Sequence, residues 1–190
     1  MSRLAAGDLA PPIDATSIRG DGVRIPNPSA GIVHLQFRRF AGCPICNLHL
    51  RELAAHADDI RARAIREVVV FHSSQAEMEP YQAALPFDCI ADPGKALYRR
   101  YGVETSLLSV LHPAAMWAGL RGVLSSRRVS LTMENGVLGL PADFLIGPDG
   151  RIRAAHYGEH AYDNWDVDTL LDLAGRYVGA QVSVPISPAA

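Results

Sequence analysis

The sequence predicts an α/β protein in which a mixed β-sheet is flanked by helices. Apolar, strand-like runs alternate with segments whose apolar residues recur at helical spacing, the order typical of α/β folds. The last part of the chain contains a predicted strand pair followed by one helix, so the sheet is expected to be mixed. A length of 190 residues, 48% hydrophobic and 20% charged, fits one globular domain over 1–190.

Each element follows from a local pattern. Residues 1–30, rich in proline and glycine, are an expected N-terminal extension with one short hairpin around Asp21 and Gly22. Mostly apolar runs predict buried strands, and apolar residues at helical spacing predict amphipathic helices. The strands are expected at 31–37, 67–72, 87–91, 139–147 and 151–157. The helices are expected at 43–64, 75–84, 92–101 and 166–177.

Two segments stand outside this alternation. Residues 104–130 carry their own apolar face and predict a helical insertion. That face is interpreted as core beneath the insertion, with a cap over the active site or a dimer surface as the alternative. Residues 182–190, with two prolines and several small residues, are an expected flexible tail.

Composition narrows the classes of function. The formal net charge is only −2, so broad attraction to nucleic acid or to a membrane surface is not expected. The sequence shows neither a signal peptide nor an apolar stretch of membrane-spanning length. A cytoplasmic location is therefore expected, and a cysteine pair there stays available for chemistry.

Such a pair occurs where the first predicted strand gives way to a helix. Residues 43–46 read Cys-Pro-Ile-Cys. A cysteine in the first turn of a helix faces unpaired N–H groups and the positive end of the helix dipole, both of which favour the reactive thiolate. Cys46 lies one turn further on the same face, within reach of a disulfide. We therefore expect an exposed nucleophile at Cys43, a resolving thiol at Cys46, and a buried structural thiol at Cys89.

A metal site is the alternative for this pair. Cys43, Cys46 and His49 form a C-x2-C-x2-H pattern, but structural zinc needs four ligands and usually a second ligand pair, which the sequence lacks. Neither a metal nor another cofactor is expected, because the cysteines themselves can carry the electrons.

Other polar residues fall near the expected position of the dithiol. His34 and His72 lie in or at the end of central strands, where His72 could accept a proton; a hydrogen-bonded core residue is the more common outcome. Asp143 could be a buried general base for Cys46 or could point to solvent.

Five sequence pieces in fixed order support a resemblance to a known family. They are Gly-Asp-Leu-Ala-Pro-Pro at 7–12, the Cys-Pro-Ile-Cys segment, Ala-Asp-Pro at 91–93, Gly-Leu-Pro-Ala-Asp-Phe-Leu-Ile at 139–146, and Pro-Asp-Gly-Arg-Ile at 148–152. The chain resembles the thioredoxin-like superfamily, and within it the peroxiredoxin-like branch of the AhpC/TSA (alkyl hydroperoxide reductase/thiol-specific antioxidant) family. The resemblance implies a thioredoxin-like fold.

The chain departs from the family's peroxide site. The family motif resembles Pro-x-x-x-Thr-x-x-Cys with a distant arginine. Phe40 stands at the threonine position, Gln36 at the proline position, and residues 141–144 replace the strand that would carry the arginine. Arg38 or Arg39 could supply positive charge instead. Leu140 and Pro141 resemble the cis-proline loop of thioredoxin, which implies a substrate-binding role for both.

The resulting hypothesis is a thiol-dependent oxidoreductase that performs either disulfide exchange or peroxide reduction. Its substrate would be a peroxide or a protein or small-molecule disulfide, and a thioredoxin or glutathione system would supply reducing thiols. A homodimer is a further possibility. The alternative is a non-enzymatic redox sensor or binding module whose dithiol gates a partner surface.

Overall fold

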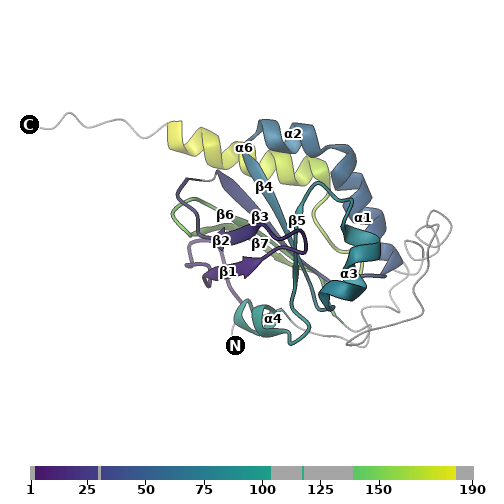
Figure 1. Cartoon of the computed structure of the whole chain (residues 1–190). Coiled ribbons are helices and arrows are strands. Elements are labelled where there is room, and N and C mark those ends of the chain that lie inside the picture. Colours follow the sequence, from purple (N-terminus) through teal and green to yellow (C-terminus); the bar gives the residue numbers. More distant parts are fainter. Residues whose placement is uncertain (1–2, 30, 104–116, 118–138, 183–190) are drawn as a thin grey trace, which may run out of the picture.

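The computed structural model describes residues 3–29, 31–103, 117 and 139–182 (Figure 1). Its centre is a five-stranded mixed sheet in the order β5-β4-β3-β6-β7, which confirms the predicted α/β class. β3 pairs in parallel with β4, and β4 with β5, whereas β6 is antiparallel to both β3 and β7. The strands are β3 (Ile32–Arg38), β4 (Ile65–Phe71), β5 (Asp88–Ala91), β6 (Ala142–Ile146) and β7 (Ile152–Tyr157).

Helices and a separate hairpin surround this sheet. The predicted hairpin forms a two-stranded sheet from β1 (Ile13–Thr16) and β2 (Gly22–Ile25). The helical insertion predicted at 104–130 lies outside the described residues apart from Trp117, as do residues 183–190 of the predicted tail. The helices are α1 (Pro44–Ala55), α2 (Ala57–Ala62), α3 (Gln75–Gln82), α4 (Ala96–Arg100) and α6 (Val167–Val182).

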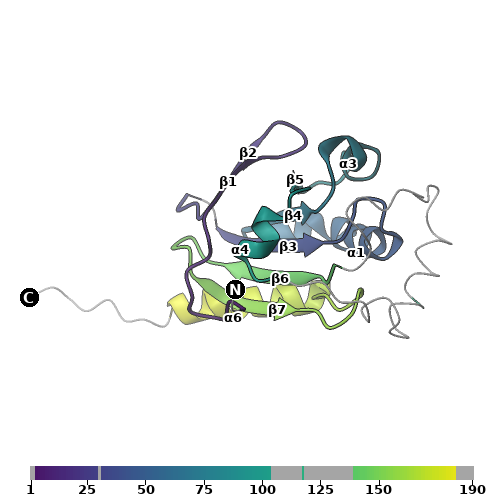
Figure 2. The same cartoon turned by 90° about the horizontal axis from the view of Figure 1, so that it is seen from below.

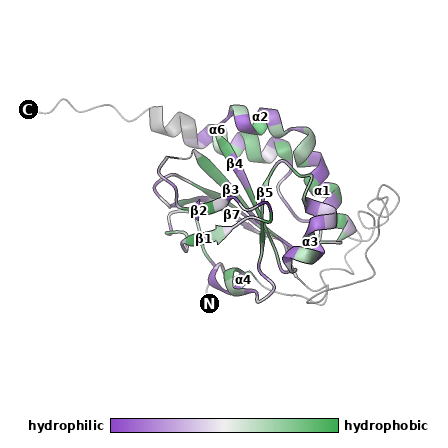
Figure 3. Cartoon of the chain, viewed as in Figure 1, coloured by the Kyte–Doolittle hydropathy of each residue, from purple (hydrophilic) through white to green (hydrophobic). Residues whose placement is uncertain are grey.

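Alternate residues of β3 face two different apolar layers. Val33, Leu35 and Phe37 belong to a core shared with the hairpin and α4. Ile32 faces the opposite core, to which α1, α2, α3 and α6 contribute. Figures 1 and 2 show α6 running alongside the sheet, with α2 beside it in Figure 1, and Figure 3 shows hydrophobic stretches in the strands with hydrophilic ones between them. On the helical side, β3 places three polar residues in what would otherwise be apolar core: His34, Gln36 and Arg38.

Three predicted helix boundaries are wrong: the helix expected to end at 177 continues to Val182, and the other two have a local cause. The helix expected over 43–64 is two helices, because His56 leaves the helical conformation (φ −110°, ψ 18°) and the chain restarts as α2, which buries Ile60. The helix expected from Asp92 starts only at Ala96. The Asp92 carboxylate instead accepts the N–H groups of Ala96 (2.9 Å) and Leu97 (2.8 Å), which caps the first turn from outside it.

The topology brings three chain segments to one edge of the sheet. The antiparallel register pairs Phe37, near the end of β3, with Ala142, at the start of β6. The loop that follows β7 reaches the same edge, since Ala142 also pairs with Tyr157. The chain passes from β3 into α1 at this edge, so the dithiol lies there. Of the helices that the structure describes, none combines the length and the hydrophobicity that a membrane crossing requires.

Candidate active site

Cys43 caps the N-terminus of α1. Its backbone is extended (φ −62°, ψ 115°), and its sulfur accepts a hydrogen bond from the Cys46 N–H at 3.4 Å. Pro44 occupies the first helical position, where the missing N–H costs no hydrogen bond. The sulfur therefore faces the positive end of the helix, as the sequence predicts.

Both sulfurs are buried, so the expectation of an exposed Cys43 is wrong. The exposed fraction is 0% for Cys43 and 2% for Cys46. The residue at the threonine position of the family motif, Phe40, packs in the same cluster, together with Ala161 from the loop after β7. A local pattern could place Cys43 at the end of a helix, but part of its cover, Ala161, comes from a distant segment of the chain.

Arg39 supplies the positive charge at the dithiol. Its Nη2 donates to the Cys43 sulfur at 3.0 Å, and the guanidinium is itself buried. Arg38 is directed elsewhere, with its Nη2 2.7 Å from Asp143 Oδ1. The two adjacent arginines thus have different roles, because consecutive residues at the end of a strand point to opposite faces.

The two thiols behave as one titrating pair. Burial raises the pKa of Cys46, but a hydrogen bond from Cys43 and the charge of Arg39 outweigh burial and lower that pKa to about 6. Burial and the negative charge on its neighbour raise the pKa of Cys43 well above the ordinary value. The first proton is therefore lost easily and shared across the pair. Because the two thiols share the charge, it can reside on either sulfur, and the two donors that converge on the Cys43 sulfur, from Arg39 and from the Cys46 N–H, stabilise it there.

A buried charged network lies behind the dithiol, on the helical side of the sheet. His34 is central to it: Nδ1 lies 2.9 Å from Glu67 Oε2, and Nε2 lies 3.1 Å from Asp143 Oδ1. Gln36 connects the network by donating to Glu67 and accepting from Arg38 Nη2 at 2.6 Å. The register explains this meeting, since Cα pairing sets Gln36 opposite Asp143 and His34 opposite Glu67.

Charge in this network is balanced. Burial lowers the pKa of His34, but the Glu67 and Asp143 carboxylates outweigh it and raise the pKa to about 9. Arg38 and His34 hold the pKa of Asp143 well below its usual range despite burial. Two cations thus face two carboxylates in the core. Asp143 is buried, but it stays ionised in ion pairs, so it is not poised to take a proton from Cys46 near neutral pH.

His49 joins the network from α1. Its Nε2 lies 3.1 Å from Arg38 Nη2, which makes Nε2 the acceptor of that bond. Burial and the charge of Arg38 lower the pKa of His49 to about 3, so the ring is neutral. Among the described residues, no group of three histidine, cysteine or acidic side chains is arranged to hold a metal ion.

The network and the dithiol predict opposite dependences of stability on pH. The raised pKa of His34 stabilises the fold fully below pH 6.5, and this contribution is lost as the pH rises towards 9. The lowered pKa of Cys46 gives the opposite dependence. Its contribution to the stability of the fold is present above pH 9.0 and is lost as the pH falls to about 6. In the reduced protein the two effects offset each other.

We therefore expect a Cys43→Ser/Cys46→Ser variant to reveal the His34 contribution. Its free energy of unfolding should fall by up to about 3 kcal/mol between pH 6.5 and 9, whereas that of the reduced parent should change much less. Urea unfolding at a series of pH values measures both. Equal pH profiles for the two proteins would contradict this assignment.

The remaining predicted residues lie around the site. His72 is buried at the end of β4 with its ring against Tyr98, 5.7 Å between centroids. Leu140 and Pro141 are buried, and the Pro141 carbonyl accepts the Gly158 N–H at 2.9 Å. Among the described residues only the Ile25–Pro26 bond is cis, so the bond before Pro141 is trans and differs in this respect from the cis-proline loop of thioredoxin.

Cys89 is separate from the dithiol. It is buried in β5, and burial raises the pKa of its thiol to about 12. Its structural role is therefore as the sequence predicts, since a thiol with so high a pKa is unreactive.

Comparison with known proteins decides the family. The family model for the AhpC/TSA antioxidant enzyme matches residues 52–160, which is more than half of the chain. The chain belongs to the AhpC/TSA family. The matched segment begins after the dithiol, so membership supports the fold and thiol redox chemistry in general, while the roles of Cys43 and Cys46 depend on the local geometry.

Individual relatives of this AhpC/TSA protein are distant. Peroxiredoxin-like 2C of Takifugu rubripes is 19% identical over 153 residues, covering 70% of this chain and 65% of its own length. The chain thus spans just under two thirds of that curated relative. Reduced 2-Cys peroxiredoxin of Plasmodium vivax has a TM-score of 0.68 at 14% identity, with 98% of this chain and 88% of that one covered. A protein described as the thiol:disulfide interchange protein DsbE of Chlorobium tepidum has a TM-score of 0.60 at 19% identity, with 90% and 99% covered. These structures confirm the thioredoxin-like fold.

Sequence reasoning missed two parts of this AhpC/TSA site. Glu67 was not singled out, and Gln36 was considered only for its place in the family motif, although each places a polar side chain in an otherwise apolar strand, a signal that could have indicated a buried network. The loop over 158–166 had no such signal, because nothing local shows that Ala161 reaches the dithiol.

Proposed function

We propose that this AhpC/TSA protein is a thiol-dependent peroxidase that reduces small hydroperoxides. Cys43 is the nucleophile and Cys46 the resolving thiol. The observation that carries the proposal is the contact of 3.0 Å between Arg39 Nη2 and the Cys43 sulfur, made at the N-terminus of α1. One cation therefore favours the thiolate and lies where a leaving oxygen gains negative charge.

The chemistry proceeds in three balanced steps. The Cys43 thiolate attacks one peroxide oxygen; the O–O bond breaks, the sulfur loses two electrons, and the departing oxygen takes a proton to become an alcohol or water. The Cys46 thiol then attacks the Cys43 sulfenic acid, which forms a disulfide and releases water. An external dithiol or two thiols, of the thioredoxin or glutathione type in the cytoplasm, reduce the disulfide to two thiols.

Burial of the dithiol favours a small substrate. A peroxide oxygen needs to reach only one sulfur atom, whereas a folded protein disulfide would have to pass the side chains that cover Cys43. Arg39 also offers a hydrogen-bond donor to a peroxide in place of the hydroxyl that Phe40 lacks. Leu140 and Pro141, at the same edge of the sheet, are proposed to border the substrate.

Stopped-flow mixing of the reduced protein with hydrogen peroxide tests this function. We expect thiol consumption orders of magnitude faster than that of a free thiol, ending in a Cys43–Cys46 disulfide detected by mass spectrometry. Cys43→Ser should abolish the fast reaction, whereas Cys46→Ser should form a sulfenic acid at Cys43 without the disulfide. Cys89→Ser is the matched control and should behave like the parent.

A second candidate is dithiol–disulfide exchange. The observation that favours it is the pair itself, two cysteines in the first turn of one helix, combined with an apolar Phe40 at the threonine position. Slow peroxide consumption together with rapid reduction of a small disulfide would select this function. Inertness in both assays would favour the redox-sensor alternative.

A further inference from the structure

The loop between β7 and α6 contributes directly to the cover of the dithiol. In this 158–166 loop, Ala161 is 1% exposed and belongs to the cluster that contains both reactive sulfurs. Tyr162 is partly buried and packs against the same cluster. Its hydroxyl donates to Glu52 Oε2 of α1 at 3.3 Å, so one side chain connects the loop to the helix that carries the dithiol.

The loop is held in this position by its own contacts. Asp163 organises it: Oδ1 lies 2.9 Å from His156 Nε2, and Oδ2 accepts the Glu159 N–H at 2.8 Å. At Gly158 an added Cβ would lie 2.5 Å from the Asp163 carbonyl oxygen and 2.7 Å from Pro141 Cγ. Only glycine fits such a close approach, so the loop closes tightly against the start of β6.

We propose that Ala161 and Tyr162 determine the substrate class by limiting the size of the group that reaches Cys43. The preferred substrate is then hydrogen peroxide or a hydroperoxide with a small alkyl group, and bulky aromatic hydroperoxides are disfavoured. This inference rests on the proposed function. Its physical basis is packing: a bulky substituent needs space that the phenol ring and the tightly closed loop already occupy.

The test compares reaction rates with hydrogen peroxide and with cumene hydroperoxide. Tyr162→Ala removes the ring, and Asp163→Ala loosens the loop without altering the cluster. In each variant we expect the rate with cumene hydroperoxide, relative to that with hydrogen peroxide, to rise about tenfold, the size of effect that one apolar contact gives in substrate discrimination. Tyr177→Ala is the matched control, because this half-buried tyrosine packs on Arg153, near the turn at the opposite end of β6 and β7.

A second readout separates this inference from the proposed function. Alkylation of Cys43 by iodoacetamide and by a pyrene maleimide, mapped by mass spectrometry, measures access without any peroxidase reaction. A rise in the ratio of pyrene maleimide to iodoacetamide labelling in both loop variants supports the size limit. An unchanged ratio in both overturns it, even if peroxide is reduced. A parent protein that does not consume peroxide refutes the peroxidase function alone.

Discussion

Replacing Arg39 by methionine is expected to slow the reaction with hydrogen peroxide at pH 7 by about a hundredfold or more. Methionine has a similar length and can fill the buried space, but it provides neither charge nor a donor to the Cys43 sulfur. The first pKa of the dithiol should then rise from about 6 towards 9.0. At pH 7 the thiolate fraction would fall from most of the protein to about one part in a hundred.

Two further effects determine the net rate. A thiolate of higher pKa is intrinsically more nucleophilic, by roughly fifteen- to thirtyfold over this range, which recovers part of the loss. Loss of a donor at the leaving oxygen costs about 10²- to 10³-fold. The second effect is larger, so the rate should fall even where the thiol is fully ionised.

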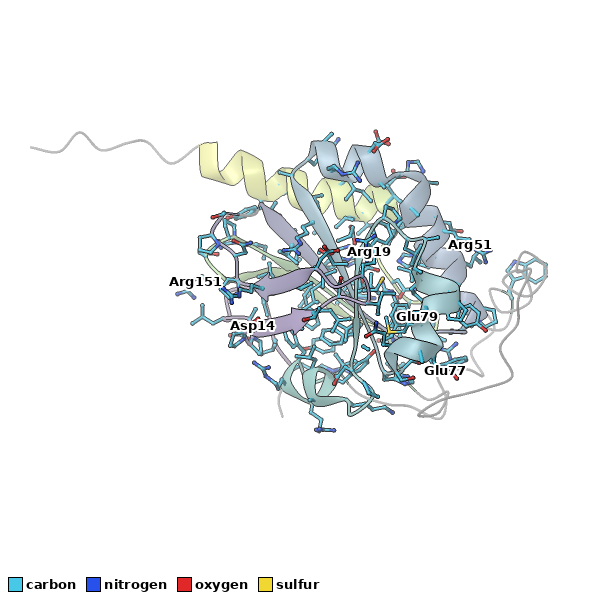
Figure 4. All side chains as sticks on the ribbon, viewed as in Figure 1. Asp14, Arg19, Arg51, Glu77, Glu79 and Arg151 are labelled. Carbon is cyan, nitrogen blue, oxygen red and sulfur yellow. The ribbon has the colours of Figure 1, made fainter. Side chains whose placement is uncertain are left out.

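The pH dependence of iodoacetamide labelling measures the pKa separately from the peroxide rate. Arg39→Lys should keep part of the lowered pKa, because it retains the charge, but should lose the fixed direction of the guanidinium. Arg51→Met is the matched control: Arg51 is exposed on the outer side of α1 (Figure 4) and should leave both quantities unchanged. A parent-like pH profile in Arg39→Met would contradict the assigned role.

Replacing Asp143 by asparagine is expected to destabilise the fold by about 3 to 5 kcal/mol, the usual cost of removing one partner from a buried ion pair. The carboxylate lies 2.7 Å from Arg38 Nη2 and 3.1 Å from His34 Nε2, and all three side chains are buried. An amide of the same shape leaves an excess positive charge in the core.

The loss should itself depend on pH. With a neutral asparagine at position 143, the pKa of His34 should fall. The parent gains most from the His34 charge at low pH, so the destabilisation should be larger at pH 6 than at pH 9. Urea unfolding at both values measures it. Asp149→Asn is the matched control, since its ion pair with Arg153 (2.6 Å) involves a carboxylate that is 49% exposed and should change stability by less than about 1 kcal/mol. A similar small change in Asp143→Asn would show that the network does not hold the core together.

Most of the fold could be predicted from local pattern. Each of the five central strands and the hairpin was expected near its observed position, because strand periodicity, glycine and proline act within a few residues. The break at His56 and the late start of α4 could not be predicted. They depend on the packing of Ile60 and on capping by Asp92, a side chain outside the helix it caps.

For the site, the sequence by itself determined the local chemistry: two thiols at the start of a helix, with Pro44 in its first turn. Only the tertiary structure decided which arginine faces Cys43, why Asp143 stays ionised, and how the sulfurs are buried. His34 and Asp143 are 109 residues apart in the chain and meet through the register of β3, β4 and β6. Arg39 and Arg38 are adjacent in sequence, yet the alternation of side chains at a strand end sends them to different partners. Such long-range pairings arise from the whole sheet, so no local pattern of residues encodes them.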